Sequence, residues 1–133
     1  MAALNRFHQA QNMCLDNAIS ELRLGEKKSH WIWFVFPQLK GLGKSITSNY
    51  YGLNGMNETV EYYNDPKLRR NLHRCFRLVL RMKNIEDCFG SDTVKIHSSA
   101  TIFYLATKKN IFKKVLNKFF GGSLDERTVL LLK

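Results

Sequence analysis

The stretch Ser29-His30-Trp31-Ile32-Trp33-Phe34-Val35-Phe36-Pro37-Gln38-Leu39-Lys40-Gly41-Leu42-Gly43 is the densest aromatic and apolar segment of this chain and contains both of its tryptophans. Its apolar run, 31–36, has no period, so it fits a buried strand as well as a short buried helix. We favour a helix, because Ser29 can cap its start and Pro37 disfavours helical geometry at Phe36. The segment is either a plug of the core with no ligand or one wall of a site.

The length and composition are typical of one globular domain, which we expect to span residues 1–133. Of the 133 residues, 44% are hydrophobic and 24% are charged. The first residues lack the apolar core of a secretory signal, and the longest apolar run is too short to cross a membrane. Three cysteines without metal-ligand spacing predict free thiols. We therefore expect a cytoplasmic protein with no membrane contact, no metal and no cofactor.

Apolar residues recur at helical spacing along most of the chain. They predict helices over 4–24, 58–64, 66–83, 91–107, 110–120 and about 125–132, while 44–57 is expected to be loop and turn. The predicted fold is all-α, a compact single-domain multihelical bundle of five to seven helices. Gln11 lies on the apolar face of the first helix. Its buried amide needs partners, and we favour a hydrogen bond to a neighbouring backbone over a place in a pocket.

Several motifs together resemble one small, widespread and mostly bacterial family of unknown function. They are Arg6-Phe7, Ala10-Gln11, Glu21-Leu22-Arg23-x-Gly25, Ser29-His30-Trp31-x-Trp33-Phe34-x-Phe36-Pro37-Gln38, Gly41-Leu42-Gly43-x-Ser45, Phe89-Gly90, Ser98-Ser99-x-Thr101-x-Phe103 and Phe119-Phe120-x-Gly122. The resemblance covers nearly the whole chain in order. Some genomes label the family "calpastatin-like", a label to which we attach no functional meaning. The resemblance implies a compact, mostly helical fold and no particular reaction.

Polar side chains beside the tryptophan segment and on the expected helix 91–107 suggest a ligand pocket. The candidate ligand-binding residues are His30, Trp31, Trp33, Gln38, Lys95, Ser98, Ser99 and Thr101. Aromatic faces suit a planar base, while a lysine and hydroxyls suit a phosphate. This favours a nucleotide-like ligand, such as an NAD or ADP-ribose derivative. Hydrolysis with His30 or Glu21 as the acid or base is an option, but no carboxylate pair, triad or metal spacing assigns a catalytic residue.

The second half of the chain carries the whole net charge of +10. Residues 67–133 contain fifteen Lys and Arg against five Asp and Glu. Four arginines fall on the outer face of the expected helix 66–83, namely Arg70, Arg74, Arg77 and Arg81. Such a face is either simply solvated or an anion-binding surface. The alternative function is thus a non-enzymatic interaction domain that binds a polyanion, either an acidic protein or nucleic acid, with the tryptophans serving only as core.

Overall fold

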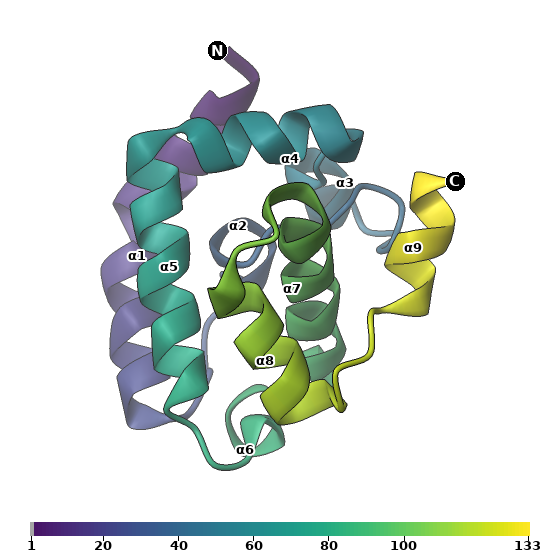
Figure 1. Ribbon diagram of the computed structural model, residues 1–133. Coiled ribbons are helices and arrows are strands. Elements are labelled where there is room, and N and C mark those ends of the chain that lie inside the picture. The colour runs from purple at the N-terminus through teal and green to yellow at the C-terminus, as the bar shows by residue number, and fades with distance from the viewer. Residues whose placement is uncertain (1) are drawn as a thin grey trace.

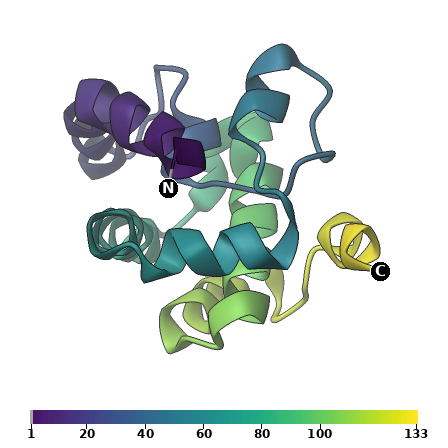
Figure 2. The same ribbon diagram turned by 90° about the horizontal axis from the view of Figure 1, so that it is seen from above.

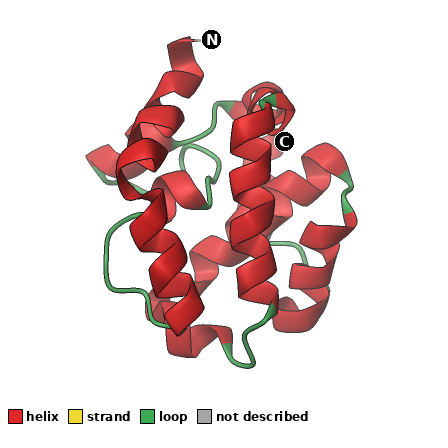
Figure 3. Ribbon diagram, turned by 90° about the vertical axis from the view of Figure 1, so that its left-hand side faces the viewer, coloured by secondary structure: helices red, strands yellow, loops and turns green. Residues whose placement is uncertain are grey.

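The computed structural model describes residues 2–133 and consists of helices joined by short loops (Figures 1 and 3). The described residues form nine α-helices and two short 3-10 turns, η1 (Ala2–Leu4) and η2 (Gly90–Asp92). The helices are α1 (Asn5–Leu24), α2 (Ile32–Val35), α3 (Ile46–Tyr51), α4 (Gly55–Asn64), α5 (Pro66–Leu80), α6 (Ile85–Phe89), α7 (Thr93–Thr107), α8 (Asn110–Phe120) and α9 (Glu126–Leu132). The only β-type pairing among these residues is an isolated bridge between Leu39 and Leu53.

The all-α class agrees with the sequence, but the expected count of five to seven helices is wrong. The short helix expected within 31–36 is present as α2, and the chain adds two more helices of six and five residues, α3 and α6, which are too short to show the helical period clearly. The segment 44–57, expected to be loop and turn, contains α3 and the start of α4. The Ser45 hydroxyl starts α3 by accepting a hydrogen bond from the Ser48 N–H at 3.0 Å.

Helix α7 lies in the middle of the molecule, in contact with α4, α6, α8 and α9 (Figure 1). Helices α1 and α5 pack side by side on one flank, and α9 stands at the opposite side (Figure 2). Rings from four elements meet in the core. Phe36 and Phe76 pack edge to face at 4.9 Å, Phe76 and Phe112 at 5.3 Å, and Phe112 stacks on Phe103 at 5.6 Å. All four are fully buried, which makes them a large source of apolar burial.

Gln11 joins three helices through hydrogen bonds in this core. Its amide nitrogen donates to the Phe34 carbonyl of α2 at 2.8 Å and to the Tyr62 hydroxyl of α4 at 2.9 Å. Its amide oxygen accepts from Asn71 of α5 at 3.0 Å. The expected backbone partner is confirmed, and the amide also reaches two side chains that no local pattern indicates.

The tryptophan segment forms α2 and ends in a turn that lies against α7 and α9. The helix stops at Phe36, as expected before Pro37, but Ser29 does not cap it. After the proline, the backbone of 38–40 pairs with Leu53, with Lys40 N–H donating to the Leu53 carbonyl at 2.9 Å. A side chain at Gly52 would place its Cβ 2.5 Å from the Lys40 Cα, so this close crossing of two backbones requires glycine.

The three cysteines, Cys14, Cys75 and Cys88, are free thiols, as expected. Burial raises the pKa of Cys75 to about 12 and that of Cys88 to about 11, which leaves both thiols protonated and unreactive at neutral pH. Residues 2–133 contain no group of three or more His, Cys, Asp or Glu side chains placed to hold a metal ion. None of the helices in this range combines the length and the apolar character that crossing a bilayer requires.

Candidate functional site

An open cleft of about 490 Å³ lies where the turn after α2 meets the start of α7 and the start of α9. We name it the tryptophan cleft. The lining side chains that bear on its chemistry are Trp33, Gln38, Lys44, Lys95, Ser98, Asp125 and Arg127. Three separate segments of the chain supply them, so the cleft exists only in the folded protein.

Trp33 and Lys95 form the aromatic and cationic wall of the tryptophan cleft. Trp33 is half-buried, and the Lys95 ammonium lies 5.1 Å from the centroid of its ring. Lys95 is held there by Asp92, whose carboxylate lies 2.7 Å from the Lys95 nitrogen. The contact places a positive charge next to an aromatic face, an arrangement that attracts both a planar ring and an anionic group.

Gln38 contributes a buried amide to the same wall. The residue is 4% exposed, and its amide nitrogen has no hydrogen-bond partner among the described residues. A buried donor without a partner costs about 1–3 kcal/mol. Its backbone is nevertheless firmly placed, since the Gln38 carbonyl accepts from the Leu53 N–H at 2.8 Å. The Gln38 amide nitrogen is therefore a buried donor beside the cleft wall, without a partner among the described residues.

Ser98 and Asp125 form the floor and hold α9 against α7. The Ser98 hydroxyl donates to the Asp125 carboxylate at 2.9 Å, and the Asp125 N–H donates to the Thr101 hydroxyl at 2.9 Å. The same carboxylate caps α9 by accepting from the Thr128 hydroxyl at 2.6 Å and from the Thr128 N–H at 3.2 Å. Asp125 therefore makes several hydrogen bonds to α7 and α9, whereas the Gln38 amide nitrogen has no partner among the described residues.

The tryptophan cleft carries more positive than negative charge. Lys44, Lys95 and Arg127 line it against the single carboxylate of Asp125. The Arg127 guanidinium donates to the Leu42 carbonyl at 2.7 Å, which fixes its position at the rim. The excess of cations favours a ligand with at least one anionic group.

The structure brings together four of the eight residues that the sequence suggests. Trp33, Gln38, Lys95 and Ser98 line the cleft, while the other four do not. His30 is exposed outside the lining, and Trp31 is buried in the core. Ser99 and Thr101 are also buried. The Thr101 hydroxyl is bonded, and the Ser99 hydroxyl has no partner among residues 2–133.

Three of the four charged lining residues, Lys44, Asp125 and Arg127, are not among the residues that the sequence suggests. Asp125 shows only the signature of a helix cap, which is indeed one of its roles. Lys44 and Arg127 are isolated cations with no pattern around them. No sequence signal distinguishes them from ordinary surface charges.

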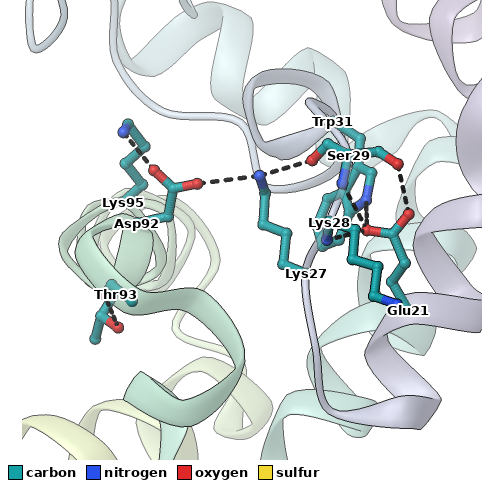
Figure 4. Close-up of polar contacts among 9 residues, drawn as sticks. Glu21, Lys27, Lys28, Ser29, Trp31, Asp92, Thr93 and Lys95 are labelled. Atoms are coloured by element: carbon teal, nitrogen blue, oxygen red, sulfur yellow. Dashed lines mark hydrogen bonds and ion pairs between the residues drawn. The ribbon is translucent and has the colours of Figure 1, made fainter.

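The Glu21 carboxylate holds the loop before α2 through several hydrogen bonds (Figure 4). Its carboxylate accepts hydrogen bonds from the Lys28 N–H at 2.6 Å, the Ser29 N–H at 2.9 Å and the Ser29 hydroxyl at 2.6 Å. The Trp31 indole N–H donates to it at 3.0 Å. Burial raises the pKa of Glu21, but these hydrogen bonds outweigh it and lower the pKa to about 2. Such a carboxylate stays ionised at neutral pH and has no proton to donate as a general acid.

A chain of ion pairs connects this loop to the tryptophan cleft (Figure 4). The Lys27 ammonium donates to the Ser29 carbonyl at 2.7 Å and lies 3.1 Å from the Asp92 carboxylate. Asp92 in turn pairs with Lys95. Burial raises the pKa of Asp92, but its bonds to Lys95 and Lys27 prevail, so the pKa lies below its ordinary value. The loop before α2 therefore helps to hold Lys95 over Trp33.

The arginines of α5 are exposed, as expected, but they do not form one surface. Arg70 and Arg77 line an open cleft beside α4 and the α7–α8 connection. Arg74 faces a shallow groove against α1. The outward face of a helix is wide enough that residues three and four apart border different neighbours.

Comparisons with known proteins bear on the whole chain. The family described as "Protein of unknown function (DUF1810)" matches residues 1–132. Among solved structures, the chain is similar to the conserved hypothetical protein Rv1873 from Mycobacterium tuberculosis, with 42% sequence identity and a TM-score of 0.94. That match covers 97% of this chain and 95% of the other. Among curated proteins, no match is found.

Proposed function

We propose that this protein, which belongs to the DUF1810 family of proteins of unknown function, binds a nucleotide-like ligand in the tryptophan cleft. The ligand combines a planar base with phosphate, as in NAD or ADP-ribose derivatives. One observation carries the proposal: an aromatic ring, a buried unpartnered amide and a fixed cation, those of Trp33, Gln38 and Lys95, converge on a single cleft.

Each part of such a ligand has a matching group in the tryptophan cleft. The half-buried ring of Trp33 offers a surface on which a base can stack. The Gln38 amide can donate to a ring nitrogen or carbonyl, which would relieve its lack of a partner. Lys95 and the rim residues Lys44 and Arg127 supply positive charge for phosphate. The volume of about 490 Å³ falls within the range of small-molecule sites.

The geometry supports binding more directly than hydrolysis. His30 and Glu21, the acid–base candidates suggested by the sequence, lie outside the cleft lining. Glu21 is also fully engaged by the loop before α2. The one carboxylate in the lining, Asp125, accepts hydrogen bonds from Ser98 and Thr128. The proposal therefore ends at binding and assigns no catalytic residue.

Titrations with AMP, ADP, NAD and ADP-ribose test the proposal. Binding is monitored by tryptophan fluorescence and by thermal unfolding. A probe present at about a hundred times its Kd should add about 2.7 kcal/mol to the free energy of unfolding and raise Tm by several degrees. Trp33→Phe should remove most of the fluorescence change, because Trp31 lies in the core.

Charge-matched variants locate the binding. Lys95→Gln should lower the affinity for whichever probe binds the wild-type protein. Lys114→Gln, which changes an exposed lysine on α8, should leave that affinity unchanged. His30→Ala should also bind normally, since His30 is exposed outside the cleft lining. If none of the probes shifts Tm, or if Lys95→Gln and Lys114→Gln weaken binding equally, the tryptophan cleft is not the binding site.

A second candidate function is the binding of a polyanion, an acidic protein or nucleic acid, to the basic second half. It is favoured by the exposure of Arg70, Arg74, Arg77 and Arg81, none of which forms an ion pair with an acidic side chain among the described residues. Binding of a single-stranded oligonucleotide measured at several salt concentrations tests it. A purely electrostatic contact requires a steep loss of affinity with salt, and an affinity that is independent of salt excludes it.

A further inference from the structure

A second open cleft, of about 860 Å³, lies between the end of α4, the outer face of α5 and the connection from α7 to α8. We name it the histidine cleft. The side chains that decide its chemistry are Tyr63, Arg69, Arg70, His73, Arg77 and Lys109. It shares no lining residue with the tryptophan cleft.

Four permanent cations line the histidine cleft, and its lining contains no carboxylate. Arg69, Arg70, Arg77 and Lys109 also have no acidic partner in any ion pair among residues 2–133. Four other cationic side chains, those of Arg6, Lys27, Lys28 and Lys95, do form ion pairs with carboxylates. Like charges gathered in a concave surface raise its positive potential and draw in anions.

One of these cations is held in place by the protein itself. The Arg69 guanidinium donates to the Tyr63 carbonyl at 3.1 Å and lies over the Tyr63 ring, 5.9 Å from its centroid. Arg70 is the next residue of α5 and Arg77 lies about two turns beyond it, and both side chains are exposed. The guanidinium groups on α5 therefore combine a fixed donor with two that are free to close on a ligand.

The inner part of the histidine cleft contains a tyrosine–histidine pair. The Tyr63 hydroxyl lies 2.6 Å from His73 Nε2, and both rings pack near Phe112 of α8, at 6.0 and 5.8 Å. Tyr63 is 8% exposed and His73 is half-buried. This pair adds neutral hydrogen-bonding groups behind the ring of cations, which a merely solvated charge stripe would lack.

The N-terminus of helix α8 adds further positive charge beside the histidine cleft. It begins at Asn110, directly after the lining residue Lys109, and its first turn has no side-chain cap among the described residues. The unpaired N–H groups of a first turn carry partial positive charge. They add to the cationic character of this side of the histidine cleft.

We propose that the histidine cleft is a binding site for the oligophosphate group of a ligand, with Arg70 and Arg77 closing on the phosphates in front of Tyr63 and His73. Guanidinium groups match phosphate oxygens in pairs of parallel hydrogen bonds, and several of them suit an anion with several phosphates. The proposal is independent of the tryptophan cleft. It also differs from diffuse polyanion binding, because it requires these two arginines and not Arg74 of α5 or Arg81 at the end of that helix.

His73 reports directly on occupancy. Burial lowers the pKa of His73, and Arg77, Arg69 and Lys109 lower it further, so the imidazole is neutral at pH 7. Tyr63 of α4 faces it as a neutral hydrogen-bond partner. A bound oligophosphate offsets the three cations and favours the imidazolium. The pKa of His73 should therefore rise when the site is filled.

Inorganic tripolyphosphate is the probe, with affinity measured by calorimetry at fixed ionic strength. Arg70→Gln with Arg77→Gln should weaken binding about tenfold or more, because charge-assisted hydrogen bonds are lost. Arg74→Gln with Arg81→Gln is the matched control, because Arg74 lies on α5 and Arg81 at its C-terminal cap, the change in net charge is the same, and all four arginines are exposed. The control should change the affinity less than about twofold.

An NMR titration of the His73 ring, with and without saturating tripolyphosphate, gives the second readout. The pKa of His73 should rise as the wild-type site fills, and in the Arg70→Gln, Arg77→Gln variant the same rise should require about tenfold more tripolyphosphate. Equal losses of affinity in both double variants would mean that the whole basic surface, and not this cleft, attracts the anion. No binding to the wild type, or binding that leaves the pKa of His73 unchanged, also overturns the proposal.

Discussion

The carboxylate of Glu21 on α1 accepts a hydrogen bond of 3.0 Å from the indole nitrogen of Trp31, which stands just before α2. Trp31 is 1% exposed, so its one polar atom would otherwise be buried without a partner. Because the same carboxylate also binds the backbone of residues 28 and 29, α1 holds the tryptophan segment at its start. Three predictions concern this segment, and a fourth concerns the ion pair of Arg6 and Glu58.

Glu21→Gln should lower the free energy of unfolding at pH 7 by about 1 kcal/mol, a value reduced for the partial exposure of the carboxylate. The pKa of Glu21 is lowered from 4.5 to about 2, so its contribution is complete above pH 4.5 and is lost as the pH falls toward 2. Urea unfolding at pH 7 and pH 3 measures this. The difference in the free energy of unfolding between wild type and variant should be smaller at pH 3 than at pH 7. Glu61→Gln, which changes an exposed carboxylate, is the control and should show no such difference at either pH.

Gln38→Met should raise the free energy of unfolding by about 1 kcal/mol, because it removes a buried amide nitrogen that has no partner. Gln11→Met is the matched control. Gln11 is equally buried, at 4% exposure, but its amide is fully bonded, so this change should cost about 2 kcal/mol or more. Urea unfolding distinguishes the two. A clear loss of stability in Gln38→Met would show that the Gln38 amide is satisfied in solution.

Gly43→Ala should destabilise the protein and disturb Trp33. The added Cβ would lie 2.6 Å from the Ser48 hydroxyl and 3.0 Å from Cη2 of Trp33, which costs about 1–3 kcal/mol in a tightly packed site. Thermal unfolding and the emission maximum of Trp33 report the two effects. Ser48→Gly removes the nearest obstacle, so in that background Gly43→Ala should cost less. If Gly43→Ala lowers the stability equally in the wild-type protein and in the Ser48→Gly variant, this steric cause is excluded.

Glu58→Gln should cost about 3 kcal/mol, because it leaves the buried guanidinium of Arg6 without its counter-charge. The two groups lie 2.7 Å apart, with side chains 11% and 9% exposed. Replacing both residues by methionine should recover part of the loss, since the unpaired charge is then absent. A double-mutant cycle by urea unfolding measures the coupling. Additive losses would mean that the pair is not coupled in solution.

The local features of the fold could be predicted from the sequence because they depend on residues a few positions apart. The spacing of Leu68, Leu72 and Phe76 indicates the buried face of α5, and Asp65 with Pro66 marks its start. The exposure of the α5 arginines follows from the same periodicity. The stop of α2 at Phe36 follows from Pro37. Helices α3 and α6 escaped prediction because six and five residues do not complete two turns.

By itself, the sequence determined that this protein is helical, which faces of its long helices are buried, and that polar groups border the tryptophan segment. Only the tertiary structure decided that Trp33, Gln38 and Lys95 meet Asp125 in one cleft, while His30 lies outside its lining. It also decided that Arg70 and Arg77 border His73 and that Arg74 does not. The physical reason is the sequence distance over which each interaction acts. Helix caps and the spacing of apolar residues act within one or two helical turns, whereas a cleft depends on how helices distant in the sequence pack, and the whole core sets that packing.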